Sequence, residues 1–274
     1  MKGPCLVSAS KVQAAEFHAD PRKIIYTAAD SGDEPLLMAG RLKGVPVIKS
    51  ASRYEGGIFA LQSFKPNASR SFLFILDDGF QHWSLHRDIN IVLIDGLNPF
   101  GNRKLLPLGV LREPLKELKR ADMFVITRQR NERLAKELRD GWPEKPLYFS
   151  DYSVVKAVNK AASEYAPEAL RNRRVFAFCG IAYPESFKRT LLSLSISLAG
   201  FKSYRDHHFY TQSDMDYLER QSRALQCEFM LTTEKDMIKL RELEIPDTIF
   251  SLEIKWDADA AFFDEVFGRI GATT

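Results

Sequence analysis

The sequence has few cysteines and no long apolar run. Its three cysteines, Cys5, Cys179 and Cys227, lie far apart and form no CxxC pair. This pattern excludes a thiolate metal site or a disulfide framework and is typical of a reducing compartment. The best apolar run, residues 191–201, is interrupted by three serines and falls short of the roughly 18–20 residues that span a bilayer. Because the N-terminus also lacks the apolar stretch of a signal peptide, we expect a cytoplasmic protein.

Net charge is also low, at +3, which is too small to imply a nucleic-acid partner by itself. The charge is unevenly distributed, since residues 103–133 contain nine Lys or Arg against four Asp or Glu. A locally basic stretch suits an anionic substrate or an anionic membrane surface. The alternative is a solvated helical face with paired charges, and charge alone favours it.

Short apolar runs alternate with helical patterns along the chain. The runs expected to be strands are residues 23–27, 45–49, 72–76, 89–94, 123–127, 147–149, 175–179, 229–232 and 249–252. The segments with helical character are residues 35–44, 112–120, 131–141, 184–199 and 213–226. Apolar strands separated by helices predict an α/β fold with a doubly wound, mostly parallel sheet. Two prolines and a glycine at 141–146 predict a domain boundary, giving domains 1–145 and 146–274.

Two adjacent carboxylates, Asp77 and Asp78, directly follow the apolar run 72–76. Adjacent carboxylates repel each other unless a cation or hydrogen-bond donors neutralise them. At the end of a buried strand, such groups commonly hold a hydrated Mg²⁺ over a phosphate. We therefore expect phosphoryl-transfer chemistry here. The alternative is that a strand-end aspartate only caps the next turn.

Three other polar motifs have both a structural and a functional interpretation. Asp33, in GDEP, is either only the N-terminal cap of a helix or an acidic base at that helix terminus. The triplet 206–208, Asp-His-His, indicates a metal site or a base with its orienting partner. The motif TTEKD at 232–236 is either part of a site or a capping box. These alternatives remain open at the level of local sequence.

The motifs become informative as an ordered set. They are GDEP at 32–35, DDGFQH at 77–82, GN…LLPLGVLREP at 101–114, FCGIAYPESF at 178–187, DHHFYT at 206–211 and TTEKDMIKL at 232–240. The set resembles the tetraacyldisaccharide 4′-kinase family, the lipid A biosynthesis kinases of Gram-negative bacteria. The resemblance implies a P-loop NTPase-like core, here residues 1–145, and a smaller α/β lobe, residues 146–274, that closes the active-site cleft.

The resemblance also implies an activity and its location. The family transfers the γ-phosphate of ATP to the 4′-hydroxyl of an acylated glucosamine disaccharide 1-phosphate, at the inner face of the cytoplasmic membrane. By this resemblance Asp33 would assist deprotonation of the sugar hydroxyl, and His207 or His208 would support it. Asp77 and Asp78 would bind Mg²⁺ and the phosphates of ATP.

Five further residues take substrate-binding roles by the same resemblance. Gln81 and His82 would line the site, and Arg53 would bind anionic substrate. Arg112 and Glu113 belong to the LREP segment near the same cleft. These roles suit phosphoryl transfer, in which positioning and charge neutralisation supply most of the catalysis.

The sequence departs from the family in two respects, a P-loop and a hydrophobic N-terminal helix that we do not find in it. Family members carry a glycine-rich P-loop, roughly GGTGKTP, well before GDEP, and a hydrophobic N-terminal helix. No GxxxxGK[ST] motif occurs in these 274 residues, so the β- and γ-phosphates lack their usual cradle. We expect little or no kinase activity from this chain alone. The explanations are a start codon assigned too far downstream, a fragment, or a paralogue that has lost ATP binding.

Two other functions therefore remain as alternatives. One is a non-catalytic homologue that binds the acylated disaccharide or a partner protein. The other is a metal-dependent phosphohydrolase that uses Asp77, Asp78, His82 and the Asp-His-His triplet as ligands. An in-frame GGTGKT upstream of Met1 would select the kinase. Lipid binding without ATP binding would select the first alternative, and stoichiometric Mn²⁺ or Zn²⁺ with phosphatase activity the second.

Overall fold

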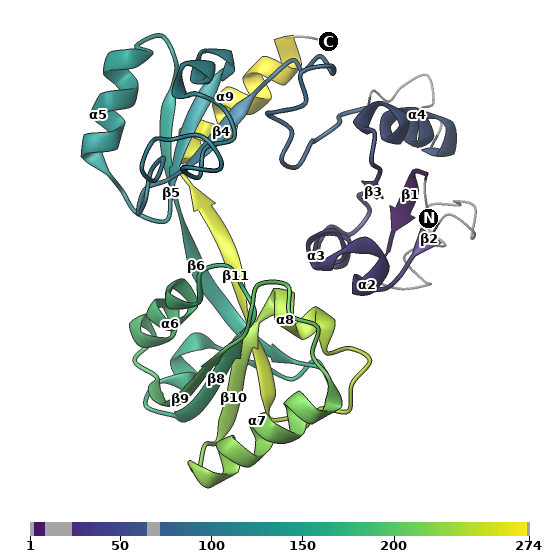
Figure 1. Cartoon of the computed structure of the whole chain (residues 1–274), viewed down its shortest axis with the longest axis vertical. Coiled ribbons are helices and arrows are strands. Elements are labelled where there is room, and N and C mark those ends of the chain that lie inside the picture. Colours follow the sequence, from purple (N-terminus) through teal and green to yellow (C-terminus); the bar gives the residue numbers. More distant parts are fainter. Residues whose placement is uncertain (1–2, 9–23, 65–71, 273–274) are drawn as a thin grey trace. The chain divides into compact units, whose positions relative to one another are not determined.

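The computed structural model describes residues 3–8, 24–64 and 72–272 and has an α/β fold divided into two compact units (Figure 1). The first unit comprises residues 1–74 and 154–253, and the second comprises residues 75–153 and 254–274. Two of the three crossings between them lie inside long strands, β6 (Leu147–Asn159) and β11 (Ile249–Ala258). The units therefore differ from the expected division at 145/146. The prolines there end α5 and lead into β6, so they mark a turn rather than a linker.

The larger of the two sheets has eight strands, and most of them belong to the first unit. Its strands run in the order β11–β10–β8–β9 with parallel neighbours, and the short β7 pairs antiparallel with β6. The elements are β7 (Glu164–Tyr165), η3 (Pro167–Leu170), β8 (Arg174–Cys179), α6 (Pro184–Ser193), β9 (Ser197–Ser203), α7 (Gln212–Ala224), β10 (Phe229–Thr233) and α8 (Glu234–Lys239).

Strand β8 shows why this sheet is covered on both faces. Val175, Ala177 and Cys179 belong to the apolar cluster that includes α6. The alternate residues Phe176 and Phe178 belong to the cluster that includes α7. Successive side chains of a strand point to opposite faces, so a continuous apolar run needs a cover on each side. The predicted α/β fold is confirmed, and in this part of the sheet β11, β10, β8 and β9 are parallel neighbours covered on both faces.

A smaller, three-stranded sheet lies at the N-terminal end of the first unit. Its order is β2–β1–β3, with β1 parallel to β2 and antiparallel to β3. The elements are β1 (Cys5–Val7), β2 (Ile24–Ile25), α2 (Ala28–Ser31), α3 (Asp33–Arg41), β3 (Val47–Lys49) and α4 (Arg53–Phe64). Helix α3 packs on α8 through Leu36, Ala39 and Ile238, all of them buried. This packing fixes the helix that begins at Asp33.

The second unit repeats the two-sided plan. Its strands β4 (Ile91–Asp95), β5 (Met123–Thr127) and the first part of β6 are parallel. Its helices are η2 (Leu115–Arg120), α5 (Glu132–Gly141) and α9 (Ala260–Ala272). Phe124 and Ile126 pack in the cluster that contains α5, whereas Met123 and Val125 pack with Phe262 of α9. Every residue of β5 is buried, as its unbroken apolar run predicts.

Two predictions of secondary structure are wrong. Residues 72–76 form no strand: Phe72 to Ile75 are 36–86% exposed and the run lies in neither sheet. β-propensity alone does not make a strand without a paired neighbour. The expected helix 184–199 ends at Ser193, and β9 begins at Ser197. There Leu194, Ile196 and Leu198 alternate with serines, and that period of two is typical of a strand.

Several shorter corrections apply as well. Residues 112–120 form only the 3₁₀ helix η2, and β6 and β11 extend well past the predicted 149 and 252. The prediction at 23–27 falls partly on Lys23, outside the described residues; the described part contains β2. Within the described residues, no helix is both long and apolar enough to span a bilayer.

Candidate active site

The first unit brings together two predicted residues that are 174 positions apart. His207 Nδ1 lies 3.1 Å from Asp33 Oδ1 and 3.0 Å from Oδ2. The Asp33 side chain is 9% exposed, whereas that of His207 is 58% exposed. A buried carboxylate that holds an exposed imidazole by one ring nitrogen is an arrangement suited to general acid–base chemistry.

Local backbone geometry presents both members of this pair. Gly32 ends α2 and precedes α3 with φ +87°, a left-handed conformation that a side chain at this position would strain. Asp33 is therefore the first residue of α3, where it also accepts a hydrogen bond from the Glu34 amide at 3.1 Å. His207 itself has φ +55°. Non-glycine residues in this region are uncommon and cluster at functional sites.

A buried ion pair lies beneath the His207 loop. The Lys239 ammonium is 2.7 Å from Asp236 Oδ1, and the two side chains are 4% and 0% exposed. The Gly180 amide donates to Asp236 Oδ2 at 3.0 Å, and the Gly180 carbonyl accepts from the His207 amide at 3.2 Å. A Cβ on Gly180 would lie 3.1–3.3 Å from three atoms of this region. The loop is thus tied to a buried charge.

The same interior raises the pKa of two neutral groups. Burial, with a smaller effect of the Asp236 carboxylate, raises the pKa of the Cys179 thiol to about 12. Burial and then Asp236 likewise raise the pKa of Tyr210 far above its ordinary value. The Tyr210 ring also lies 5.3 Å from the Lys239 ammonium, a cation–π distance. Both groups stay protonated, so the region around Asp236 contains no second negative charge from them.

The TTEKD motif anchors the helix that carries Asp33. Thr233 caps α8, its hydroxyl accepting from the Asp236 amide at 3.1 Å, which is one of the two bonds of the predicted capping box. Lys235 pairs with Glu34, and Glu234 pairs with Arg41 at 2.6 Å. Because both partners belong to α3, this motif holds the Asp33 helix to the sheet.

The two adjacent histidines have different surroundings. The His208 ring stacks on Tyr204 with centroids 4.4 Å apart, and its Nε2 lies 3.3 Å from Asp214 Oδ2. Asp214 also completes the capping box of α7 with Thr211. His208 is therefore engaged in packing the start of α7, and His207 is the histidine that contacts Asp33.

Arg53 begins α4, directly after β3. Its guanidinium donates to the Ser50 carbonyl at 3.0 Å and the residue is half-buried. A neighbouring cation, Lys49, donates to the Asp30 carbonyl at 2.7 Å. These contacts fix Arg53 locally, and its role toward an anionic substrate stays a prediction.

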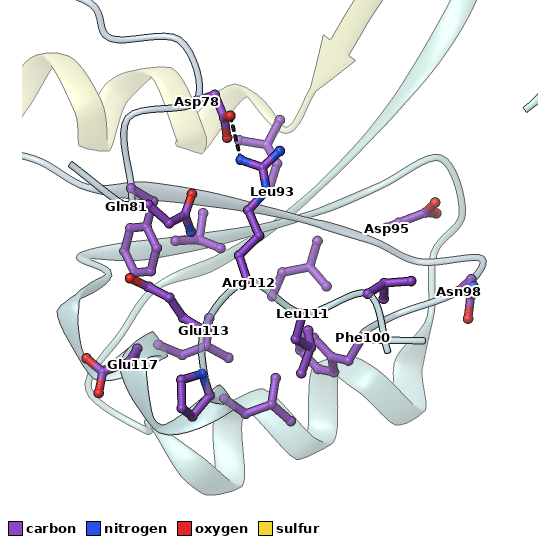
Figure 2. A pocket seen from close by; sticks show the side chains of 17 residues that line it. Asp78, Gln81, Leu93, Asp95, Asn98, Phe100, Leu111, Arg112, Glu113 and Glu117 are labelled. Carbon is purple, nitrogen blue, oxygen red and sulfur yellow. Dashed lines mark hydrogen bonds and ion pairs between the residues drawn. The ribbon is translucent and has the colours of Figure 1, made fainter. Parts of the chain in front are cut away.

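The second unit contains a pocket of about 320 Å³ that unites parts of DDGFQH and LREP (Figure 2). Asp78, Gln81, Arg112 and Glu113 are among the residues that line it, and the Arg112 side chain reaches to Asp78 (Figure 2). Arg112 Nη1 lies 2.6 Å from Asp78 Oδ2, and this hydrogen bond, followed by the carboxylate's charge, raises the pKa of Arg112. Asp95, at the end of β4, also lines the pocket. An exposed ion pair beside further polar groups could exchange partners with a phosphate.

Asp77 and Asp78 are both exposed, and Asp78 has φ +50°. Because residues 72–76 form no strand, the pair lies on a turn and not at a strand end. In the described part of the chain, no group of three or more His, Cys, Asp or Glu side chains could hold a metal ion. Mg²⁺ commonly uses one or two carboxylates and completes its shell with water and phosphate oxygens. The two carboxylates therefore fit Mg²⁺ held jointly with a nucleotide, and among the described residues His82 belongs to no group of three candidate ligands.

Glu113 has both oxygens occupied. It accepts from Trp83 Nε1 at 2.6 Å and pairs with Arg120. The Arg120 guanidinium lies 4.2 Å from the ring centroids of both Phe80 and Trp83. Glu113 thus ties LREP to DDGFQH. Arg120, which sequence reasoning missed, is the centre of this cluster, and only its place in a basic stretch signalled it.

Comparison with known proteins gives the family. The family model described as LpxK, tetraacyldisaccharide-1-P 4′-kinase, matches residues 9–270. The tetraacyldisaccharide 4′-kinase of Halothermothrix orenii is 36% identical over 87% of this chain and 65% of its own length. That of Syntrophus aciditrophicus is 34% identical over 89% and 68%, and that of Aquifex aeolicus 38% identical over 82% and 64%. The chain thus spans about two thirds of these relatives.

A solved structure agrees with these matches. The structure of LpxK from Aquifex aeolicus, described as an "apo" form in complex with ATP, has a TM-score of 0.69 and 31% sequence identity. The similarity covers 99% of this chain and 75% of that one. The family expected from the ordered motifs is confirmed: the chain belongs to the tetraacyldisaccharide 4′-kinase family.

Proposed function

We propose that this chain carries the acceptor side of a lipid A 4′-kinase. The reaction transfers the γ-phosphate of ATP to the 4′-hydroxyl of an acylated glucosamine disaccharide 1-phosphate. The observation that carries this proposal is the contact between Asp33 and His207, which pairs two motifs of the family set at 3.0–3.1 Å. In the reaction Asp33 accepts the hydroxyl proton, and His207 holds the carboxylate in position.

The pocket of the second unit binds the phosphates of ATP. Asp77 and Asp78 would hold Mg²⁺ together with the phosphate oxygens of ATP, and the ion would supply positive charge for the transferring group. Arg112 leaves Asp78 for a phosphate oxygen, because a guanidinium is charged at any physiological pH and binds phosphate as well as carboxylate. Gln81 donates from its amide to the same oxygens. Glu113 acts indirectly, by holding Trp83 and Arg120 in place.

The acceptor lipid requires a membrane surface. Its acyl chains reside in the bilayer, and the basic stretch 103–133 suits an anionic inner face of the cytoplasmic membrane. Arg53 binds the anionic 1-phosphate end of the acceptor. We expect no nucleic-acid partner, because a net charge of +3 does not by itself indicate one.

The two alternatives receive less support. A metal-dependent phosphohydrolase needs a ligand cluster, and the described residues contain no group of three candidate ligands. A non-catalytic binding homologue would not need Asp33 and His207 in contact. Relatives that are 34–38% identical are named as kinases.

The test distinguishes the effect of the missing P-loop from the effect of Asp33, which acts on the acceptor hydroxyl. The family's glycine-rich segment is joined before Met1, so that β1, β2 and α2 stay intact. Transfer of label from radiolabelled ATP to the tetraacyldisaccharide 1-phosphate is then measured in detergent micelles. The chain alone should show no turnover, and the chimera should show turnover that Asp33→Asn abolishes. Robust turnover by the chain alone would refute the role given to the P-loop. If the chimera folds, binds ATP and keeps the same turnover when it carries Asp33→Asn, the role given to Asp33 is refuted.

A further inference from the structure

The second unit carries an apolar loop with an internally bonded backbone. We name residues 101–111 the leucine loop. Four of its side chains are strongly exposed: Leu105 at 43%, Leu106 at 63%, Leu108 at 76% and Val110 at 63%. Single exposed leucines are ordinary, whereas four within six consecutive residues make a local apolar surface.

Although these side chains are exposed, hydrogen bonds within the loop hold its backbone in one conformation. The Leu106 amide donates to the Leu111 carbonyl at 2.9 Å, and the Leu111 amide to Lys104 at 3.2 Å. The Asn102 side chain donates to the Leu108 carbonyl at 2.8 Å and accepts from the Lys104 amide at 3.1 Å. The loop thus satisfies much of its own backbone polarity. That is the condition for a non-helical segment to enter an apolar phase without a large penalty.

Gly109 makes this compact form possible. A Cβ at this position would lie 2.1 Å from the Lys104 carbonyl oxygen and 2.2 Å from Asn102 Oδ1. These distances are far inside van der Waals contact, so any side chain would force the loop open. The Gly109 amide also donates to the Leu105 carbonyl at 3.0 Å. The apolar surface is therefore built on a defined backbone fold.

Basic residues flank the leucines in the sequence. Arg103 and Lys104 precede the leucines and Arg112 follows them, all three exposed. Arg103 pairs with Glu137 at 2.6 Å and Arg112 with Asp78 at 2.6 Å, both at the surface. The wider stretch 103–133 has more than twice as many basic as acidic residues. An apolar tip inside a basic collar is complementary to anionic lipid, with headgroups outside and acyl chains inside.

We propose that the leucine loop inserts into an anionic lipid bilayer and positions the second unit at its surface. The occupant of this surface is thus the membrane itself: Leu106 and Leu108 enter the acyl boundary and Lys104 contacts the headgroups. The inference deepens the proposed function, on which it rests for the presence of a membrane partner. It assigns that contact to a loop adjoining the Asp78–Arg112 pocket, through Val110, Leu111 and Arg112, which line the pocket.

Vesicle sedimentation tests the proposal with the 274-residue chain as it is. The probe is phosphatidylcholine vesicles with and without phosphatidylglycerol. The chain should bind the anionic vesicles, and Leu106→Gln/Leu108→Gln should lower the partition coefficient on the order of a hundredfold, about tenfold per leucine. Lys104→Gln should lower it about fivefold on anionic vesicles only. Leu192→Gln is the matched control, because Leu192 is 54% exposed on α6, outside the loop, and should change nothing.

Insertion is then separated from adsorption. Leu108→Trp keeps the loop apolar, and its fluorescence should be quenched by brominated acyl chains beyond the quenching of the native tryptophans. Failure of the wild-type chain to bind anionic vesicles overturns the proposal. Wild-type binding by Leu106→Gln/Leu108→Gln, or fluorescence of Leu108→Trp that brominated chains do not quench, overturns it as well. Circular dichroism confirms that each variant is folded. The kinase assay in detergent micelles needs no bilayer, so failure here leaves the proposed function standing.

Discussion

Replacing Lys239 by Met should destabilise the first unit by about 3 kcal/mol. The substitution leaves the fully buried Asp236 without the ammonium that lies 2.7 Å away. An uncompensated buried charge costs about 3–5 kcal/mol. The lower end applies because the Gly180 amide and the Thr233 hydroxyl still donate to Asp236, at 3.0 and 2.7 Å. Methionine also retains most of the apolar stem of lysine.

Urea unfolding measures this loss. All three tryptophans, Trp83, Trp142 and Trp256, belong to the second unit, so tryptophan fluorescence reports on that unit and far-ultraviolet circular dichroism reports on both. A loss of about 3 kcal/mol should lower the midpoint of the first unit's transition by about 1–2 M urea. A circular dichroism midpoint equal to that of the wild type would show that the buried pair does not stabilise the fold as reasoned.

Two controls make the result specific. Lys136→Met removes a surface pair with Asp140, whose side chains are 77% and 63% exposed, and should cost less than about 0.5 kcal/mol. The double variant Asp236→Asn/Lys239→Met removes both buried charges and should recover part of the lost stability. A double variant less stable than Lys239→Met would mean that hydrogen bonding by Asp236, and not charge compensation, dominates.

Three further predictions concern the pair and its neighbours. In the P-loop chimera, Asp33→Asn should lower kcat by about a thousandfold or more, and adding His207→Ala should lower it little further, because the two act as a unit; additive losses would contradict the pairing. His208→Ala should keep wild-type kcat but cost about 1–2 kcal/mol of stability in a thermal melt, through the lost Tyr204 stack and the Asp214 bond; a kcat collapse without destabilisation would reverse the assignment. Burial raises the pKa of Asp214, but hydrogen bonds from its cap outweigh it, so the pKa lies below the ordinary 3.8. Its contribution to stability is therefore complete above about pH 4 and lost as pH falls through the folded pKa. The urea midpoints of wild type and Asp214→Asn should converge on acidification, and a constant difference down to pH about 2 would contradict this.

The pattern of apolar residues correctly predicted strands that are buried on both faces of the sheet. Met123–Thr127 is an uninterrupted apolar run and forms β5 at the predicted bounds, because burial on two sides leaves no other placement. The run 72–76 is also continuously apolar but pairs with no strand, so the pattern failed there. Whether an apolar run pairs with a neighbouring strand depends on the tertiary structure, and the composition of the run does not predict it. The helix at 184–199 was overextended for a different reason, since its last residues change from helical to alternating periodicity.

The sequence predicted which residues belong to the candidate site but not which of them contact each other. Motif order singled out Asp33 and the two histidines, yet only the fold distinguishes His207, at Asp33, from His208, at Tyr204. The buried Asp236–Lys239 pair sits in a motif that also forms an ordinary cap, so the local pattern could not reveal its link to the His207 loop. That link passes through a glycine 56 positions away from Asp236.

The discontinuous first unit also sets the order in which the protein matures during synthesis. Helix α3 packs on α8, which begins about two hundred residues later at Glu234, and β11 follows after that. At bacterial and eukaryotic elongation rates of about 5–20 residues per second, the nascent N-terminal segment waits roughly 10–40 s for its docking partner. The whole of 75–153 emerges from the ribosome meanwhile. Its strands β4, β5 and the start of β6 are local in sequence and can pair at this stage, but the face of β5 that packs on Phe262 is covered only when α9 has been made. Chaperone engagement should therefore include both the N-terminal segment and this open face of β5 while translation proceeds.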